Sequence, residues 1–418
     1  MKKAGKFRGY LKTLGPGLIT GASDDDPSGI ATYSQAGAGF GLGFLWMAPF
    51  TFPMMAALQG MCARIGLVTT SGLTNTLKKY YHPVILYAML IFSVPAIILN
   101  IGADIAGMGA VTNLLFPQIP SFLFSFVYTV ILMIIIVYYP YQKIAGILKW
   151  LCLSILLYLI VPFLVHVDWK KVLLATIVPH FELNKNFIEM LVAILGTTIS
   201  PYLFFWQATM EAEDMKHQQK KIMVDKRILK NMLADVNAGM FASNLVMLFI
   251  ILSTGVVLYS AGIREINTVD QAAKALEPLA GKFSYICFAL GVVGTGFLAI
   301  PVLTGSLSYN VAETFGWKEG LDKKFNEAKS FYIVIISSMI IGLLINVMGI
   351  SPMKALIFTA ILYGITSPVM IAVILHIGNN KKIMGEFTNS RLSNILGVMT
   401  LLVMTITAVL LIYYQFKN

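Results

Sequence analysis

Three consecutive carboxylates, Asp24, Asp25 and Asp26, stand in the middle of an otherwise apolar stretch and are followed by Pro27 and Gly29. A carboxylate at membrane depth is costly unless it is paired, hydrated or bound to a cation. Proline removes a backbone donor and glycine permits nonhelical torsions. The sequence therefore predicts an unwound segment whose carboxylates and free carbonyls bind a cation, with Asp26 as a direct ligand.

A second polar interruption lies in the apolar stretch 188–210, where Gly196, Thr197 and Ser200 precede Pro201. By itself this pattern fits a simple proline kink. Paired with the first break, however, it indicates a binding site, because corresponding interrupted helices in two repeats mark the substrate site of many transporters.

The candidate ligands all offer oxygen, since neither break contains His or Cys. Oxygen ligands suit hard cations such as Mg²⁺, Ca²⁺ or Mn²⁺. Asp24 and Asp25 would either help to attract or hold the ion or face a vestibule. For the hydroxyl residues Thr197 and Ser200, the alternative to ion binding is ordinary helix packing by small polar side chains. A lone acid in another apolar stretch, Asp104, is a candidate relay or gate. The predicted metal site comprises Ser23, Asp24, Asp25, Asp26, Gly29, Thr197 and Ser200.

The elements that position these residues are membrane-spanning helices. Of the 418 residues, 57% are hydrophobic and 12% are charged, and the mean hydropathy is +0.77. These values differ strongly from those of soluble domains, which are about 25% charged. Spans of about 20 apolar residues are predicted at 14–38, 44–66, 84–112, 121–139, 148–166, 188–210, 235–261, 283–312, 331–350, 353–377 and 394–415.

The two breaks fall in the first and sixth spans, which are equivalent positions in two five-helix halves. The halves would cover 14–166 and 188–377, and 394–415 would be an additional helix. Because five is odd, the second half must be inverted in the membrane. The whole chain, 1–418, is expected to form one all-α polytopic transmembrane domain.

Basic residues predict the orientation. Of 31 Lys and Arg, 23 lie on one side of the predicted spans and 8 on the other. The positive-inside rule then places the N-terminus in the cytoplasm and the C-terminus outside, in a multi-pass protein of the plasma membrane. This distribution explains the net charge of +11 without a nucleic-acid partner, and the lipid bilayer is the expected surrounding.

The sequence shows no motif typical of an enzyme or an ATP-driven pump. The three cysteines, Cys62, Cys152 and Cys287, are far apart in apolar runs, and we interpret them as small buried residues. No cleavable signal peptide, phosphate loop or nucleophile–base set is visible, so neither an enzyme nor an ATP-driven pump is expected, and no cofactor is predicted.

The residues resemble those of the NRAMP family of divalent metal transporters. GPGLITGASDDDPSG is similar to the family's G-P-G followed by D-P-G-N. TTISPYLFFWQA resembles its sixth-span motif, and ADIAGMGAVTNLLF resembles its third-span motif. The resemblance implies a LeuT-like fold with five-plus-five inverted repeats and an eleventh helix, and it implies that Asp26 is the family's ion-binding aspartate.

Several positions depart from the family pattern. The asparagine of D-P-G-N is Gly29 here, and the metal-binding methionine is Ser200. The two histidines of span six are replaced by Tyr202 and Gln207, and the acid three residues after Asp104 is replaced by Gly107. In span ten the family's glutamine is replaced by Ala360, and span nine carries no charge from Phe331 to Ser351.

These departures remove the soft ligand and most proton carriers, a pattern similar to the NRAMP-related magnesium transporter branch. They favour a secondary transporter that carries Mg²⁺, with Mn²⁺ as a possible second substrate, without proton coupling. A site enlarged by Gly29 and Ser200 would hold a partly hydrated ion. The alternatives are a proton-coupled Mn²⁺ importer and, from another class, a Na⁺-coupled organic-solute symporter of the same fold. The sequence does not predict the oligomeric state.

Overall fold

A computed structural model describes residues 15–139, 157–217 and 225–417, and within these ranges the regular structure is entirely helical. The longer helices are α2 (Pro16–Asp24), α3 (Pro27–Phe40), α4 (Met47–Thr69), α5 (Leu73–Tyr80), α6 (Pro83–Leu115), α7 (Ser121–Tyr138), α10 (Trp169–Ile177), α11 (Lys185–Thr198), α12 (Pro201–His217), α13 (Lys226–Thr254), α16 (Ser284–Phe315), α17 (Lys329–Ile345), α18 (Pro352–Asn379) and α20 (Arg391–Lys417). Short elements are α9 (Val161–Leu164), α14 (Val269–Ala273), α15 (Glu277–Ala280), α19 (Lys381–Met384) and a π-helical turn, η2 (Gly255–Tyr259), that continues α13.

Nine helical stretches in the described ranges are long and apolar enough to cross a bilayer, with α11 and α12 together forming one of them. The broken pair α2 and α3 supplies a further span at the position of the predicted first segment. Of the predicted span 148–166, residues 148–156 lie outside the described ranges, and the described remainder contains only short helical segments, among them α9. The all-α polytopic fold predicted from the sequence is confirmed.

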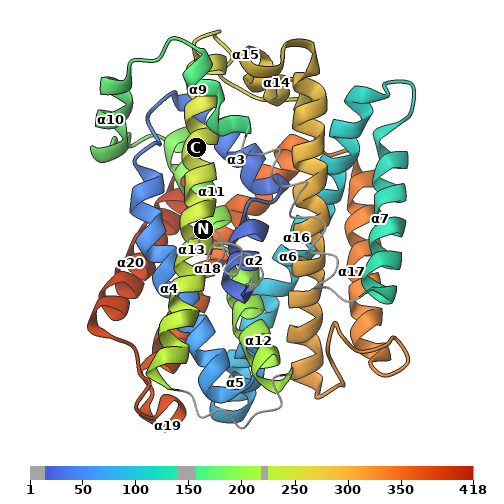
Figure 1. Cartoon of the computed structure of the whole chain (residues 1–418), viewed down its shortest axis with the longest axis vertical. Helices are drawn as coiled ribbons and strands as arrows, with labels where there is room; N and C mark the ends of the chain where they lie inside the picture. Colours follow the sequence, from blue (N-terminus) through green and yellow to red (C-terminus); the bar gives the residue numbers. More distant parts are fainter. Residues whose placement is uncertain (1–14, 140–156, 218–224, 418) are drawn as a thin grey trace, which may run out of the picture.

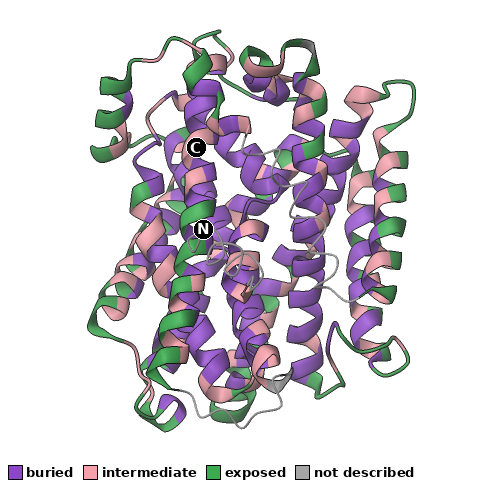
Figure 2. Ribbon diagram, viewed as in Figure 1, coloured by how far each residue is buried: buried purple, intermediate pink, exposed green. Residues whose placement is uncertain are grey.

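The helices form one upright bundle in which the broken helices are central (Figure 1). The halves α2 and α3 lie near the middle with α6 and α16 beside them, whereas α7 and α17 form one edge and α20 lies at the opposite edge (Figure 1). Burial follows this arrangement, because the central helices are mostly buried and the peripheral ones expose their outer faces (Figure 2). The α11–α12 span is almost wholly enclosed by other helices, whereas α7 turns most of its surface outwards.

The seventh span begins earlier than the hydropathy pattern predicts. The sequence predicts a start at 235, but α13 begins at Lys226. The side chain of Asp225 caps this end by accepting hydrogen bonds from the backbone N–H groups of Arg227 and Ile228. Such a cap stabilises a helix whose first turns are too polar to register as a membrane span.

Candidate metal site

The first break is short and has a clear local cause. Helix α2 ends at Asp24 and α3 begins at Pro27, so only Asp25 and Asp26 lie outside helix. Asp26 is the N-cap of α3, where its Oδ1 accepts a hydrogen bond of 2.7 Å from the backbone N–H of Gly29. Aspartate at the N-cap followed by proline at the first helical position is a strong helix start. The residues that break the span therefore also fix the Asp26 carboxylate.

The second break is equally short. Helix α11 ends at Thr198 and α12 begins at Pro201, which leaves Ile199 and Ser200 between them. The Ser200 hydroxyl lies 2.6 Å from the carbonyl oxygen of Thr197 and 3.1 Å from that of Gly196. Ser200 thus lies in the break as predicted, but its hydroxyl hydrogen is turned back to its own chain.

Oxygens from both breaks meet at Gly29. A Cβ atom placed on this glycine would lie 3.2 Å from the carbonyl oxygen of Asp24, 3.4 Å from Thr197 Oγ1 and 3.5 Å from Asp26 Oδ1. We call these three oxygens the oxygen cluster. Among the predicted ligands, the structure thus brings together Asp26, Gly29 and Thr197, with Asp24 contributing its backbone instead of its carboxylate.

The side chains of Asp24 and Asp25 turn towards α13. The hydroxyl of Ser243 donates to Asp24 Oδ2 over 2.6 Å and lies 3.3 Å from Asp25 Oδ1. The backbone carbonyl of Ser23 accepts a hydrogen bond of 3.0 Å from the Tyr202 hydroxyl. These three predicted ligands are therefore engaged with neighbouring helices and do not point with Asp26 into one cage.

Asp26 is held from a third helix, α6. Asn100 Nδ2 donates to Asp26 Oδ2 over 2.9 Å. Asp104 follows one turn later on the same face of α6; it is fully buried and interacts electrostatically with Asp26. Neither carboxylate oxygen of Asp104 forms a hydrogen bond with a described residue.

Sequence reasoning missed Asn100, Ser243 and Tyr202 as partners of the first break. The role of Asn100 could have been inferred from the sequence, because this polar amide precedes Asp104 by one helical turn in an apolar span and so lies on the same helix face. The role of Ser243 could not have been inferred, since a single serine in a membrane helix more often serves packing.

The interior around the breaks is strongly acidic. Asp24, Asp25, Asp26 and Asp104 are each no more than 5% exposed. Arg64 is the one buried basic side chain among the described residues, and its guanidinium donates to Asn389 Oδ1 over 3.2 Å, not to one of these aspartates. A cation would be favourable beside these carboxylates, which are costly at membrane depth without a partner. No group of three or more His, Cys, Asp or Glu within the described ranges is arranged to hold a metal, so such an ion would need backbone, hydroxyl or water oxygens as well.

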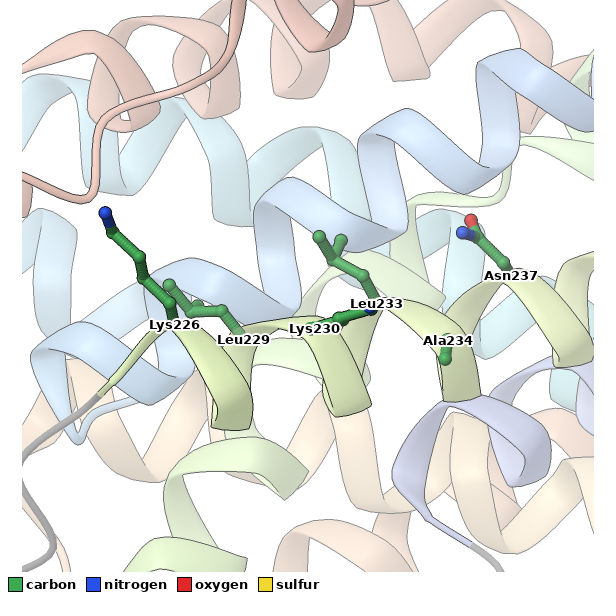
Figure 3. Close-up of a pocket in the computed structure, with 6 residues that line it drawn as sticks. All are labelled: Lys226, Leu229, Lys230, Leu233, Ala234 and Asn237. Atoms are coloured by element: carbon green, nitrogen blue, oxygen red, sulfur yellow. The ribbon is translucent and has the colours of Figure 1, made fainter.

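Two hollows lie away from the breaks. A surface groove of about 450 Å³ follows the first turns of α13 and has no acidic lining residue (Figure 3). Its lining residues are Lys226, Leu229, Lys230, Leu233, Ala234 and Asn237. A second hollow of about 210 Å³ is acidic and lies at the end of the bundle where α12 and α16 finish. It is lined by Gly72, Thr209, Ala212, Glu213, Glu313, Glu319, Asp322 and Lys323.

A multi-pass helical bundle in which two broken spans meet at buried oxygens is the architecture of a membrane transporter. Residues 17–414 match the family model described as natural resistance-associated macrophage protein-like, and the chain belongs to this Nramp family.

Relatives and solved structures agree with this assignment. A protein of Caldanaerobacter subterraneus named divalent metal cation transporter MntH is 27% identical over 99% of this chain and 95% of its own. A protein of the same name from Clostridium acetobutylicum is 24% identical over 99% and 93%. The manganese transporter of Eremococcus coleocola has the same fold, with a TM-score of 0.76, 17% identity and coverage of 96% and 86%. The nucleobase-cation-symport-1 family transporter Mhp1 has a TM-score of 0.59, 12% identity and coverage of 97% and 93%. The LeuT-like fold predicted from the sequence is thereby confirmed.

Proposed function

We propose that this chain is a secondary transporter of divalent metal ions that prefers Mg²⁺ and binds the ion at Asp26 between the two broken spans. The observation that carries the proposal is the oxygen cluster. Its members, the three atoms nearest to the added Cβ, are a carboxylate oxygen, a backbone carbonyl and a hydroxyl. Oxygen ligands of this kind suit Mg²⁺ and Ca²⁺, whereas softer ligands favour transition metals.

The remaining predicted ligands have supporting roles in this proposal. Ser200 would offer a lone pair or a water contact, because its hydrogen is already donated to Thr197. The carboxylates of Asp24 and Asp25 would hold the negative potential that draws the ion in, at a distance set by Ser243. With few direct protein ligands, the ion would keep several waters, as Mg²⁺ does in most of its protein sites.

Transport is proposed to proceed without proton coupling. The two span-six positions that carry histidine in the family are Tyr202 and Gln207 here, and neither exchanges protons readily near neutral pH. Asp104 remains as a gate without a continuing relay. The N-terminus would lie in the cytoplasm and the C-terminus outside, in the plasma membrane. The five-helix halves 14–166 and 188–377 would rock against each other around the site, with 394–415 as an additional helix.

Proton-coupled Mn²⁺ import is the second candidate. It is favoured by the names of the relatives and of the Eremococcus protein, which is called a manganese transporter. A Na⁺-coupled organic-solute symporter is less well supported, because four buried aspartates lie in or near the first break. Carboxylates at that depth disfavour an anionic solute.

Purified protein in liposomes distinguishes these functions. Uptake of Mg²⁺, Mn²⁺ and Ca²⁺ would be measured with a trapped metal dye, alongside an internal pH dye. The proposal expects Mg²⁺ entry driven by membrane voltage and no acidification of the lumen. Exclusion of Mg²⁺ combined with Mn²⁺-dependent acidification would instead establish the second candidate.

A further inference from the structure

We infer that Asn100 and Thr359 are positioning residues that hold one carboxylate oxygen of Asp26 so that the other stays in place in the oxygen cluster. This inference rests on the proposed function, because it assigns a task to the residues behind the metal site. Neither residue belongs to the two breaks, and each comes from an unbroken span, α6 and α18.

The three side chains form a buried chain. Asn100 Nδ2 donates to Asp26 Oδ2 over 2.9 Å, and Thr359 Oγ1 donates to Asn100 Oδ1 over 2.9 Å. Asn100 is fully buried, and Asp26 and Thr359 are each 2% exposed. Hydrogen bonds to a charged group in a dry interior are about twice as strong as neutral ones.

The directions of these hydrogen bonds follow from chemistry. An ionised carboxylate only accepts hydrogen bonds, so Asn100 must turn its NH₂ towards Asp26 and its carbonyl oxygen towards Thr359. The Thr359 hydroxyl has two acceptors within hydrogen-bond distance, Asn100 Oδ1 at 2.9 Å and the Leu356 carbonyl oxygen at 2.8 Å, and it shares its hydrogen between them. The neighbouring Ser28 hydroxyl, 3.3 Å from Thr359, donates to the same Leu356 carbonyl oxygen over 2.9 Å. The hydrogen bonds from Thr359 to Asn100 and from Asn100 to Asp26 run in one direction and end on the carboxylate.

The two carboxylate oxygens of Asp26 have different hydrogen-bond partners. Oδ2 receives the Asn100 amide, whereas Oδ1 receives the Gly29 N–H and belongs to the oxygen cluster. An ion approaching the cluster would therefore meet one fixed carboxylate oxygen. Fixed placement matters most for Mg²⁺, which demands near-octahedral geometry, and outer-shell hydrogen bonds commonly tune metal affinity by 10- to 100-fold.

The competing explanation is that this network only packs α3, α6 and α18 together. The Tyr363 hydroxyl also lies near the Asn100 side chain, so the region is polar in any case. A packing role predicts altered folding stability with unchanged ion affinity, whereas a positioning role predicts weaker ion binding while the maximal transport rate is retained.

The test uses Asn100→Leu, which keeps the shape and removes the donor, and the pair Thr359→Val and Thr359→Ser. Ser93→Ala is the matched control, because Ser93 is a buried residue of α6 whose hydroxyl has no hydrogen-bond partner among described residues. Titration calorimetry of the purified full chain with Mg²⁺ and with Mn²⁺ gives the dissociation constants. Liposome uptake at saturating Mg²⁺ gives the maximal rate.

We expect Asn100→Leu to weaken Mg²⁺ binding about tenfold, the lower end of the range for a lost hydrogen bond to a charged group. Thr359→Val should weaken it about three- to tenfold, within the range for a lost hydrogen bond between neutral groups. Thr359→Ser and Ser93→Ala should stay within about twofold of the wild type, and all four should keep maximal rates within about threefold. The double variant Asn100→Leu with Thr359→Val should bind Mg²⁺ no more weakly than Asn100→Leu alone. The first change already interrupts the hydrogen bonds that lead to Asp26.

Equal Mg²⁺ affinity of Thr359→Val and Thr359→Ser would overturn the inference, and this comparison still decides if Asn100→Leu does not fold. Wild-type affinity in Asn100→Leu would overturn it too. A wild-type protein that binds no Mg²⁺, Mn²⁺ or Ca²⁺ would instead refute the proposed function, so the two failures are distinguishable.

Discussion

The Tyr202 hydroxyl donates a hydrogen bond of 3.0 Å to the carbonyl oxygen of Ser23 and so joins the second half of one broken span to the first half of the other. The carbonyl oxygen of Tyr202 in turn accepts a hydrogen bond of 2.8 Å from Ser306 of α16. One residue thus ties both breaks to a third helix. The last carbonyls of α2 have no partner within that helix, and Tyr202 supplies one.

Tyr202→Phe should therefore loosen this arrangement. The Ser23 carbonyl would lose its donor in a buried setting, which costs about 1–3 kcal/mol. We expect a lower unfolding temperature in detergent and severalfold weaker Mg²⁺ binding by calorimetry. Tyr285→Phe is the control, since Tyr285 makes no side-chain hydrogen bond with a described residue. A Tyr202→Phe protein that matches the wild type in both measurements would show that the contact has no energetic role.

Gly29→Ala should damage the metal site through its size alone. The new methyl group would lie 3.2–3.5 Å from the three oxygens of the cluster, tighter than ordinary van der Waals contact for the closest of them. We expect Mg²⁺ affinity to fall at least tenfold in calorimetry. Gly39→Ala is the matched control on the same helix, because its methyl would meet neighbours at 3.3 and 3.4 Å, far from the cluster. Equal affinity of the two variants would mean that the ion does not use this space.

Ser200→Met should change which metal binds. A thioether is a soft ligand, so Mn²⁺ and Cd²⁺ binding should rise relative to Mg²⁺, by about tenfold. The change also removes the hydroxyl that now bonds Thr197. Gly29→Asn alongside it would complete the substitution, although that side chain must enter the crowded cluster. The measurement is competition calorimetry. If both variants keep the ion preference of the wild type, selectivity depends on the size of the cavity or on bound water.

Uptake of Mg²⁺ should be nearly independent of pH between 6 and 8, the range over which a histidine relay would change charge. The wild-type lumen should not acidify during uptake, and Asp104→Asn should leave that result unchanged. The measurement is an internal pH dye read during voltage-driven uptake. Metal-dependent acidification that disappears in Asp104→Asn would restore the proton-coupled Mn²⁺ reading.

Local chemistry made much of the fold predictable. Apolar runs of membrane length located the spans, and Asp26 followed by Pro27 carries the signature of a helix start that the structure places at that position. The second break likewise coincides with Pro201. These signals depend on neighbours in sequence, so they can be read without knowing the tertiary contacts.

The interior of the site was less predictable, because it depends on contacts between distant residues. Asp24 and Asp25 adjoin Asp26 in sequence, yet their side chains diverge from it. They turn towards the hydroxyl of Ser243 on α13, which lies more than two hundred positions later and hydrogen-bonds them. Asn100 lies 74 positions from Asp26. Which of the three adjacent carboxylates belongs to the oxygen cluster is decided by such partners, and the sequence pattern does not encode them locally.

The most direct test of the proposed function is voltage-driven Mg²⁺ uptake into liposomes by the Asp26→Ala variant. A divalent ion moving alone gains about 4.6 kcal/mol per 100 mV, so wild-type uptake should follow the imposed potential. Asp26→Ala should abolish uptake while helix content and purification yield stay near those of the wild type. Glu265→Gln, which changes an exposed loop acid, should transport normally. Wild-type Mg²⁺ uptake rates in Asp26→Ala would contradict the assignment of this carboxylate as the centre of the site.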